Sequence, residues 1–160
     1  MQTERTTLSG IYIIEARDAV TGSLIRTWSF YNQLTNINRD IRTAMLLGST
    51  TGYSLDTLAI RYFAFGTGTT PASASDTLLQ VELFRKAVTK ISKVNDSTVQ
   101  SIVSLSPDEC NFTIREIGVF CSPGAGASAN SGFLLSRVNV NIVKNSNMTL
   151  NIVRQDIVTI

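Results

Sequence analysis

The second half of the chain alternates apolar and polar residues in short runs, which turn signals interrupt about every dozen residues. Successive side chains of a strand point to opposite faces, so each run predicts a half-buried strand. Asparagine, aspartate, proline and glycine separate the runs. A regular series of short strands of this kind is typical of a sandwich. The predicted strands are 81–94, 98–105, 111–120, 132–143 and 148–160.

The first half of the chain begins with a predicted hairpin. Residues 11–17 and 24–31 alternate in polarity on either side of a polar turn that contains a glycine. Trp28 and Phe30 share one face of the second strand, so we interpret them as core or interface residues. Trp28, Phe30 and the adjacent Tyr31 are therefore candidate contacts with other subunits in an assembly.

A change of period after this hairpin predicts a single helix. Apolar residues recur at helical spacing, Thr35 or Asn36 can cap the N-terminus, and Gly48 can end the helix. We therefore expect one short α-helix near residues 35–47. A strongly apolar strand is expected next, at 58–65, inside a sheet.

Two charged residues of the expected helix lie off its apolar stripe. Arg39 and Asp40 form either a solvated face or a contact with a neighbouring subunit. We include both among the candidate assembly contacts.

The chain is long enough for one domain with its own core. Its 160 residues fit a single domain, and 43% hydrophobic with 16% charged residues excludes intrinsic disorder. We expect a polar N-terminal arm over 1–7, which either frays or lies across a neighbouring subunit, and one domain over 8–160. The predicted fold is mainly β, an antiparallel, jelly-roll-like β-sandwich with the single helix.

Residue content argues against an enzyme. The chain has no histidine, which removes the commonest general base and metal ligand. The carboxylates give no signal of a glycosidase pair. We interpret Glu116, beside Arg115, as a solvated or ion-paired strand position. We expect no catalytic, metal or cofactor site. The acidic residues considered are Asp108, Glu109, Glu82, Glu116 and Asp156.

Cysteine and glycine patterns also match no ligand site. Cys110 and Cys121 fit no zinc motif, and either pair as a disulfide or remain buried thiols in a protein folded in a reducing cytoplasm. The glycine-containing loop at 66–76 lacks the third glycine, the lysine and the following helix that a phosphate loop needs. We therefore expect no phosphate site there.

Charge and hydropathy limit the partners. The net charge is +2 and no run of basic residues exceeds two, so the chain lacks the electrostatic signature of a nucleic-acid-binding protein. No apolar run approaches the ~20 residues of a spanning helix. We expect neither nucleic acid nor membrane as a partner.

Five segments occur together in a familiar order. They are FAFGTGTTP at 63–71, DTLL continuing to LFRK over 76–86, TIREIGVF at 113–120, LLSRV at 134–138 and the final TI. In this order they resemble a family of small β-rich structural proteins of tailed bacteriophages, known as tail-fibre, tail-collar, baseplate or minor virion components. The resemblance covers about residues 58–160.

This resemblance implies a multi-copy structural subunit of the virion, made in the host cytoplasm. We expect it in the tail or neck region, as a collar, baseplate, fibre-adaptor or short-fibre subunit. Its partners would be other copies of itself and neighbouring virion proteins. No shaft or coiled coil follows the last strand, so we do not expect a complete long fibre.

Two alternatives remain open. The protein could be a head decoration protein, because the sequence does not separate head from tail. It could also be a module that binds a carbohydrate or host receptor, with a loop over 124–131 and Tyr53 as the binding surface.

Overall fold

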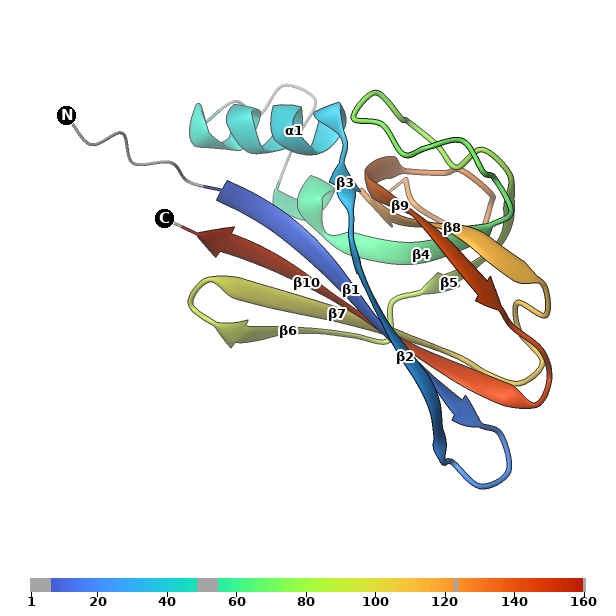
Figure 1. The fold of residues 1–160 in the computed structure, drawn as a ribbon. Coiled ribbons are helices and arrows are strands. Elements are labelled where there is room, and N and C mark those ends of the chain that lie inside the picture. The colour runs from blue at the N-terminus through green and yellow to red at the C-terminus, as the bar shows by residue number, and fades with distance from the viewer. Residues whose placement is uncertain (1–6, 49–54, 123, 160) are drawn as a thin grey trace.

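The computed structural model describes residues 7–48, 55–122 and 124–159. It shows two antiparallel sheets packed face to face, with one short helix beside them (Figure 1). The predicted mainly β sandwich with a single α-helix is confirmed. The predicted N-terminal arm falls almost entirely outside the described residues, although Thr7 already belongs to the first strand.

The first sheet, sheet A, has five strands in the order β2-β1-β10-β7-β6. Strands β1 and β10 pair along their whole length, from Thr7 with Thr159 to Asp18 with Met148. The two ends of the described chain therefore lie side by side at one end of the sandwich (Figure 1). The strands are β1 (Thr7–Asp18), β2 (Leu24–Tyr31), β6 (Lys90–Asn95), β7 (Thr98–Leu105) and β10 (Met148–Thr159).

The second sheet, sheet B, has five strands in the order β3-β9-β8-β4-β5. Strand β8 is central, and β4 lies between β8 and the edge strand β5, so the prediction that β4 is an interior strand is confirmed. The strands are β3 (Gln33–Leu34), β4 (Ile60–Gly66), β5 (Glu82–Ala87), β8 (Thr113–Cys121) and β9 (Phe133–Val143).

The single strand expected at 81–94 is wrong, because this segment forms two strands in different sheets. The chain leaves β5 and crosses to sheet A, where it continues as β6. The crossing is at two adjacent residues: Val88 N–H donates to Arg61 in sheet B, and Thr89 N–H donates to Ile102 in sheet A. Alternation of polarity continues through this corner, so periodicity alone does not reveal it.

Helix α1 (Asn36–Leu46) confirms the predicted helix. The Thr35 hydroxyl caps it by accepting from Asn38 N–H at 3.4 Å, and donates to the Leu134 carbonyl of β9 at 2.5 Å. Gly48 follows with a φ of +66°, a left-handed conformation that glycine adopts without strain. Thr35 thus joins α1 to sheet B, and a short 3₁₀ turn, Leu55–Leu58, precedes β4.

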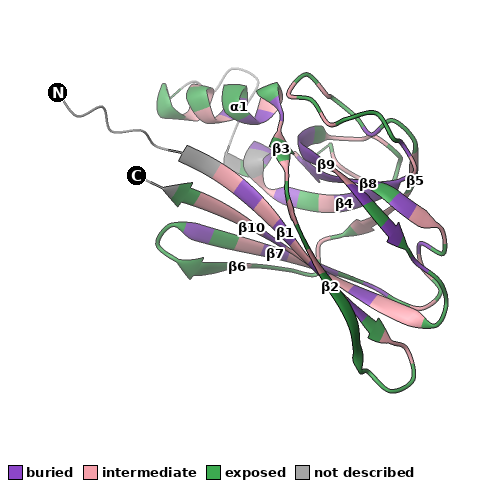
Figure 2. Cartoon of the chain, in the orientation of Figure 1, coloured by how far each residue is buried: buried purple, intermediate pink, exposed green. Residues whose placement is uncertain are grey.

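The main core fills the space between the two sheets. Alternate residues of β1, such as Tyr12 and Ile14, face alternate residues of β4, such as Phe63 and Phe65, and all four are fully buried. A second, smaller core lies on the outer side of sheet B under the loops that cross it. It contains Ala64, Leu79, Phe120 and Leu134. Figure 2 shows the resulting contrast between buried interior strands and the exposed half of β2.

Candidate functional site

The hairpin residues singled out as assembly contacts divide between two faces of β2. Trp28 and Phe30 lie opposite Ile14 and Tyr12 of β1 and are partly buried against the main core. Tyr31 points to the other face and is 80% exposed. The structure therefore brings Trp28 and Phe30 together and separates them from Tyr31.

The helix residues singled out as contacts bind each other. Arg39 Nη2 lies 3.0 Å from Asp40 Oδ1, and both side chains are exposed. An exposed pair of this kind contributes little to stability. Both residues belong to α1, which lies beside sheet B, whereas the hairpin residues belong to sheet A (Figure 1).

The outward face of sheet A, which we call the outer A face, carries a strip of partly exposed apolar side chains among uncharged polar ones. In its central row, Ile13 of β1 lies beside Val153 of β10, which lies beside Ile102 of β7. The flanking row contains Ile11 and uncharged glutamines. The helix packs on sheet B, so none of the described helices covers this face. The residues that define the outer A face are Ile11, Ile13, Tyr31, Ile102, Val153 and Ile157.

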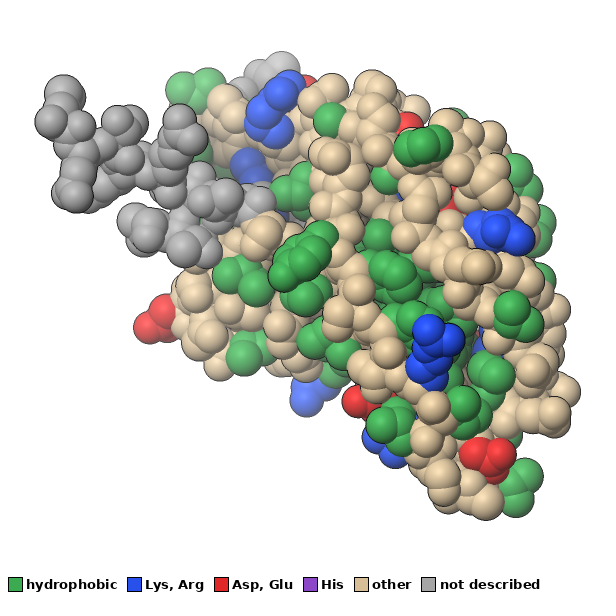
Figure 3. All heavy atoms as spheres, in the orientation of Figure 1, with side chains coloured by type: hydrophobic (Ala, Val, Ile, Leu, Met, Phe, Trp, Pro, Cys, Tyr) green, Lys and Arg blue, Asp and Glu red, His purple; other side chains and the backbone are tan. Residues whose placement is uncertain are grey.

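Charges on the outer A face are confined to its margins. Glu15 and Arg17 pair with each other at 3.0 Å toward one end. Lys90 lies on the edge strand β6. In the space-filling view, which looks at the side of the sandwich where β2 lies in front, hydrophobic side chains gather over β2 (Figure 3). A weakly charged apolar face of this kind is suited to contact with other protein.

A buried carboxylate organises the long loop between β4 and β5. Glu116 of β8 is fully buried. Its Oε1 accepts from Gly68 N–H at 3.0 Å and from Val81 N–H at 2.7 Å. Its Oε2 accepts from Gln80 N–H at 3.0 Å and from Arg137 Nε at 2.8 Å. One side chain thus holds both ends of the loop.

Arg137 of β9 extends this network to the middle of the loop. Its Nη1 donates to Asp76 Oδ2 at 2.9 Å, and its Nη2 donates to the Thr70 carbonyl at 2.9 Å. Asn139, next on the same face of β9, accepts from Ala72 N–H at 2.7 Å. We call Glu116, Arg137 and Asp76 with their partners the Glu116 network. It ties the whole loop onto the outer face of sheet B.

The Glu116 carboxylate also explains why glycine occupies positions 66 and 68 at the start of this loop. A Cβ atom on Gly68 would overlap Glu116 Oε1 and the Gln80 side chain. A Cβ on Gly66 would overlap the Val81 carbonyl and the same carboxylate. The glycines therefore make room for protein atoms, which is a structural reason for the Gly-Thr-Gly sequence.

The Glu116 network connects four of the five segments that carry the phage-protein resemblance. Gly68 and Thr70 come from the first segment, Asp76 from the second, Glu116 from the third and Arg137 from the fourth. The fifth ends at Ile160, outside the described residues. The interpretation of Glu116 as ion-paired is confirmed, but its partner is Arg137, and the solvated alternative is wrong because the side chain is fully buried.

A second buried pair fixes the loop that had been considered for glycan binding. Arg85 and Glu82 of β5 form an ion pair, and the side chains are 3% and 2% exposed. Arg85 Nη1 donates to the carbonyls of Gly126 and Ser131, and its guanidinium lies 4.5 Å from the ring centre of Phe120. The loop is anchored by a long-range contact that sequence reasoning missed. Tyr53, its suggested partner, lies outside the described residues.

Two further acids considered as catalytic groups, Glu109 and Asp156, also have cationic partners, whereas no ion pair of Asp108 is found among the described residues. Glu109 contacts Lys86 at 2.6 Å, and Asp156 contacts Arg154 at 2.5 Å. Among the described residues, no group of three or more Cys, Asp or Glu side chains could hold a metal ion. No helix in the described ranges is long and apolar enough to span a membrane.

Both cysteines are buried free thiols, which answers the question left open by the sequence. Burial raises the pKa of Cys110 and of Cys121 to about 12. A neutral buried thiol is a poor nucleophile and packs as a small apolar side chain.

Comparison of the chain with protein-family models, with curated proteins and with solved structures gives no match. The functional argument therefore rests on the chain's own residues.

Replacing Glu116 with glutamine should strongly destabilise the protein. The change removes the charge that Arg137 and three loop amides bind, and it leaves a buried guanidinium without its main partner. We expect a loss of about 3–5 kcal/mol in the free energy of unfolding, measured by urea denaturation. Glu15→Gln is the matched control, because Glu15 forms only a partly exposed pair, and it should change stability by less than about 1 kcal/mol. Similar losses for the two variants would contradict the role of Glu116.

The native thiols should resist alkylation at pH 8. With a pKa of about 12, only about one thiol in ten thousand is ionised at that pH, because the ionised fraction falls tenfold for each pH unit below the pKa. Iodoacetamide should label neither cysteine in the folded protein and both in urea, as read by mass spectrometry. Rapid labelling of the native protein, or a disulfide in the intact mass, would refute this assignment.

Proposed function

We propose that this protein is a non-enzymatic structural component of a tailed-bacteriophage virion. It is a multi-copy subunit of the tail or neck region, such as a collar, baseplate, fibre-adaptor or short-fibre subunit, and it acts by protein–protein assembly. Its partners are other copies of itself and neighbouring virion proteins.

The observation that carries this proposal is the Glu116 network. It gives a common physical role to residues from segments that are far apart in the sequence, namely Gly68, Asp76, Glu116 and Arg137. That role is to hold a loop in a fixed shape. The motif is therefore understandable as the signature of a rigid scaffold and requires no reaction chemistry.

The outer A face is the surface that we propose for assembly. Its central strands expose an apolar row with charges only at the margins. Both edges of sheet A expose apolar side chains, Ile91 and Val94 on β6 and Leu24 and Ile25 on β2, but β6 carries two lysines, Lys90 and Lys93, and β2 a single cation, Arg26. Edge lysines discourage strand addition, so the β2 side is the more suitable for contact between copies.

The alternatives have weaker support from the described residues. A head decoration protein would use the same outer A face, so particle location distinguishes it from a tail subunit. A glycan-binding loop over 124–131 would need free polar groups, but Asn130 Oδ1 already accepts from Leu79 N–H at 3.1 Å.

Self-association should depend on the outer A face. We expect the purified protein to form a defined oligomer by native mass spectrometry and sedimentation velocity. Val153→Lys should weaken this association at least about tenfold, because symmetric contacts bring the new charges onto an apolar interface. Val20→Lys is the matched control, since Val20 is 94% exposed in the β1–β2 turn, and it should leave the oligomer unchanged.

Two results would count against the proposal. A monomer at every concentration tested would contradict self-assembly and favour decoration or receptor binding. Equal effects of Val153→Lys and Val20→Lys would exclude the outer A face as the interface. Folding of both variants should first be verified by circular dichroism.

A further inference from the structure

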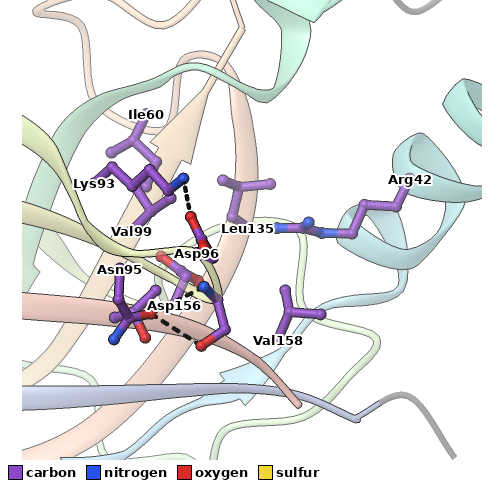
Figure 4. A pocket seen from close by; sticks show the side chains of 11 residues that line it. Arg42, Ile60, Lys93, Asn95, Asp96, Val99, Leu135, Asp156 and Val158 are labelled. Carbon is purple, nitrogen blue, oxygen red and sulfur yellow. Dashed lines mark hydrogen bonds and ion pairs between the residues drawn. The ribbon is translucent and has the colours of Figure 1, made fainter. Parts of the chain in front are cut away.

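A cavity of about 370 Å³ opens at the end of the sandwich where α1 lies. This volume is at the lower end of the range for small-molecule sites. Figure 4 shows side chains from both sheets and from α1 around it. Most of the surface of its wall is apolar, although seven of the eleven lining residues are polar or charged. The aliphatic side chains are Ile60, Val99, Leu135 and Val158.

One guanidinium reaches into this cavity without a carboxylate partner. Arg42 extends from α1 toward Leu135 and Asp156 (Figure 4). Its Nε donates to Asn38 Oδ1 at 2.7 Å, and no described carboxylate lies within ion-pair distance of it. Burial lowers the pKa of Arg42 below its ordinary value, and the nearby Asp156 charge opposes that shift. The group is thus partly desolvated and forms no ion pair with a described carboxylate.

The other charges of the wall cancel in pairs. Lys93 and Asp96 pair at the rim at 2.5 Å. Asp156 pairs with Arg154, which is fully buried beneath it. The cavity and its floor therefore contain one more positive than negative charge, and Arg42 supplies the excess.

Several buried polar side-chain atoms near this cavity lack a hydrogen-bond partner. Within the described chain, the buried side-chain atoms that lack a hydrogen-bond partner are Asn32 Nδ2 and Oδ1, Ser101 Oγ, and Arg154 Nε and Nη1. Arg154 lies beside Ser101 in the sheet register. Asn32 rests on Gly10, which pairs with Asp156. Residues two apart on one strand are about 7 Å apart, so these groups form one patch.

This patch is rich in donors. None of these residues lines the cavity, so a ligand there does not bond to them, and their contribution to the site is the positive charge of Arg154 behind the wall. An anion in the cavity balances the excess positive charge that Arg42 supplies. The aliphatic wall beside Arg42 then favours an anion that has an apolar body.

We propose that the cavity binds a small carboxylate with a short aliphatic body. The carboxylate contacts Arg42, and the body packs on Ile60, Val99, Leu135 and Val158. Arg154 contributes its charge from below the floor without lining the cavity. This binding site is independent of the assembly surface, which lies on the opposite face of sheet A.

Hexanoate is a suitable probe, and hexanol is its uncharged counterpart. A titration of the protein with hexanoate, followed by amide chemical shifts, should give a dissociation constant in roughly the millimolar range. The affinity is limited because so small a ligand makes few contacts. Shifts should be concentrated at α1, β10 and the β6–β7 turn. Hexanol should bind at least about tenfold more weakly, because it lacks the charge that Arg42 meets.

Two arginines of α1 provide matched variants. Arg42→Gln should weaken hexanoate binding at least about tenfold, whereas Arg39→Gln, on the exposed side of the helix, should leave it unchanged. Added sodium chloride should weaken binding to the unaltered protein, which tests the charge contribution without a substitution.

The proposal fails if hexanoate produces no localised shifts, or if hexanol binds equally well. It also fails if inorganic phosphate binds as tightly as hexanoate, because the aliphatic wall would then contribute nothing. Equal binding by the Arg42 and Arg39 variants would show that the anion does not contact Arg42.

Discussion

The carboxylate of Glu116 is the group on which the outer layer of sheet B depends. A charge buried this completely is very costly unless it is paired and hydrogen-bonded. Three loop amides and Arg137 meet that requirement, and they do so only when the loop lies flat on the sheet. Loop closure in turn places Leu79 over Gly118 and completes the smaller core. The same interaction therefore determines a loop conformation, two glycine positions and a packing layer.

The two sides of the sandwich consequently have different characters. Loops anchored by Glu116 and Arg85 cover the outside of sheet B, while no described helix covers the outer A face with its strip of apolar side chains. Four of the five acids considered as catalytic groups form ion pairs, namely Glu82, Glu109, Glu116 and Asp156. A molecule built in this way is suited to present a fixed shape to other proteins, which is the basis of the proposed role in assembly.

Local signals were sufficient for much of the fold. The hairpin, the capped helix and the turn-bounded strands each depend on neighbouring residues, so the printed sequence predicts them. The corner at Val88 and Thr89 was missed because alternation does not change when a chain passes between sheets. The candidate contacts Trp28 and Phe30 were correctly placed on one face, but periodicity could not show that this face is turned inward.

The Glu116 network was missed for a different reason. Its partners are 48, 36 and 21 residues away in the sequence, so no local pattern links them. The available signal was indirect: a single acid in β8, one arginine in β9, and two closely spaced glycines, Gly66 and Gly68, earlier in the chain. Such isolated charges in buried strands indicate partners, even when the sequence does not identify them.

Amide hydrogen exchange of the unaltered protein tests the central claim most directly. The N–H groups of Gly68, Gln80 and Val81 belong to a loop, yet each is bound to a buried carboxylate. The account predicts that they exchange as slowly as the amides of β8 and β9, because opening the loop would expose the buried charge. Exchange at the rate of an open surface loop would contradict the claim that Glu116 makes this loop part of the rigid structure.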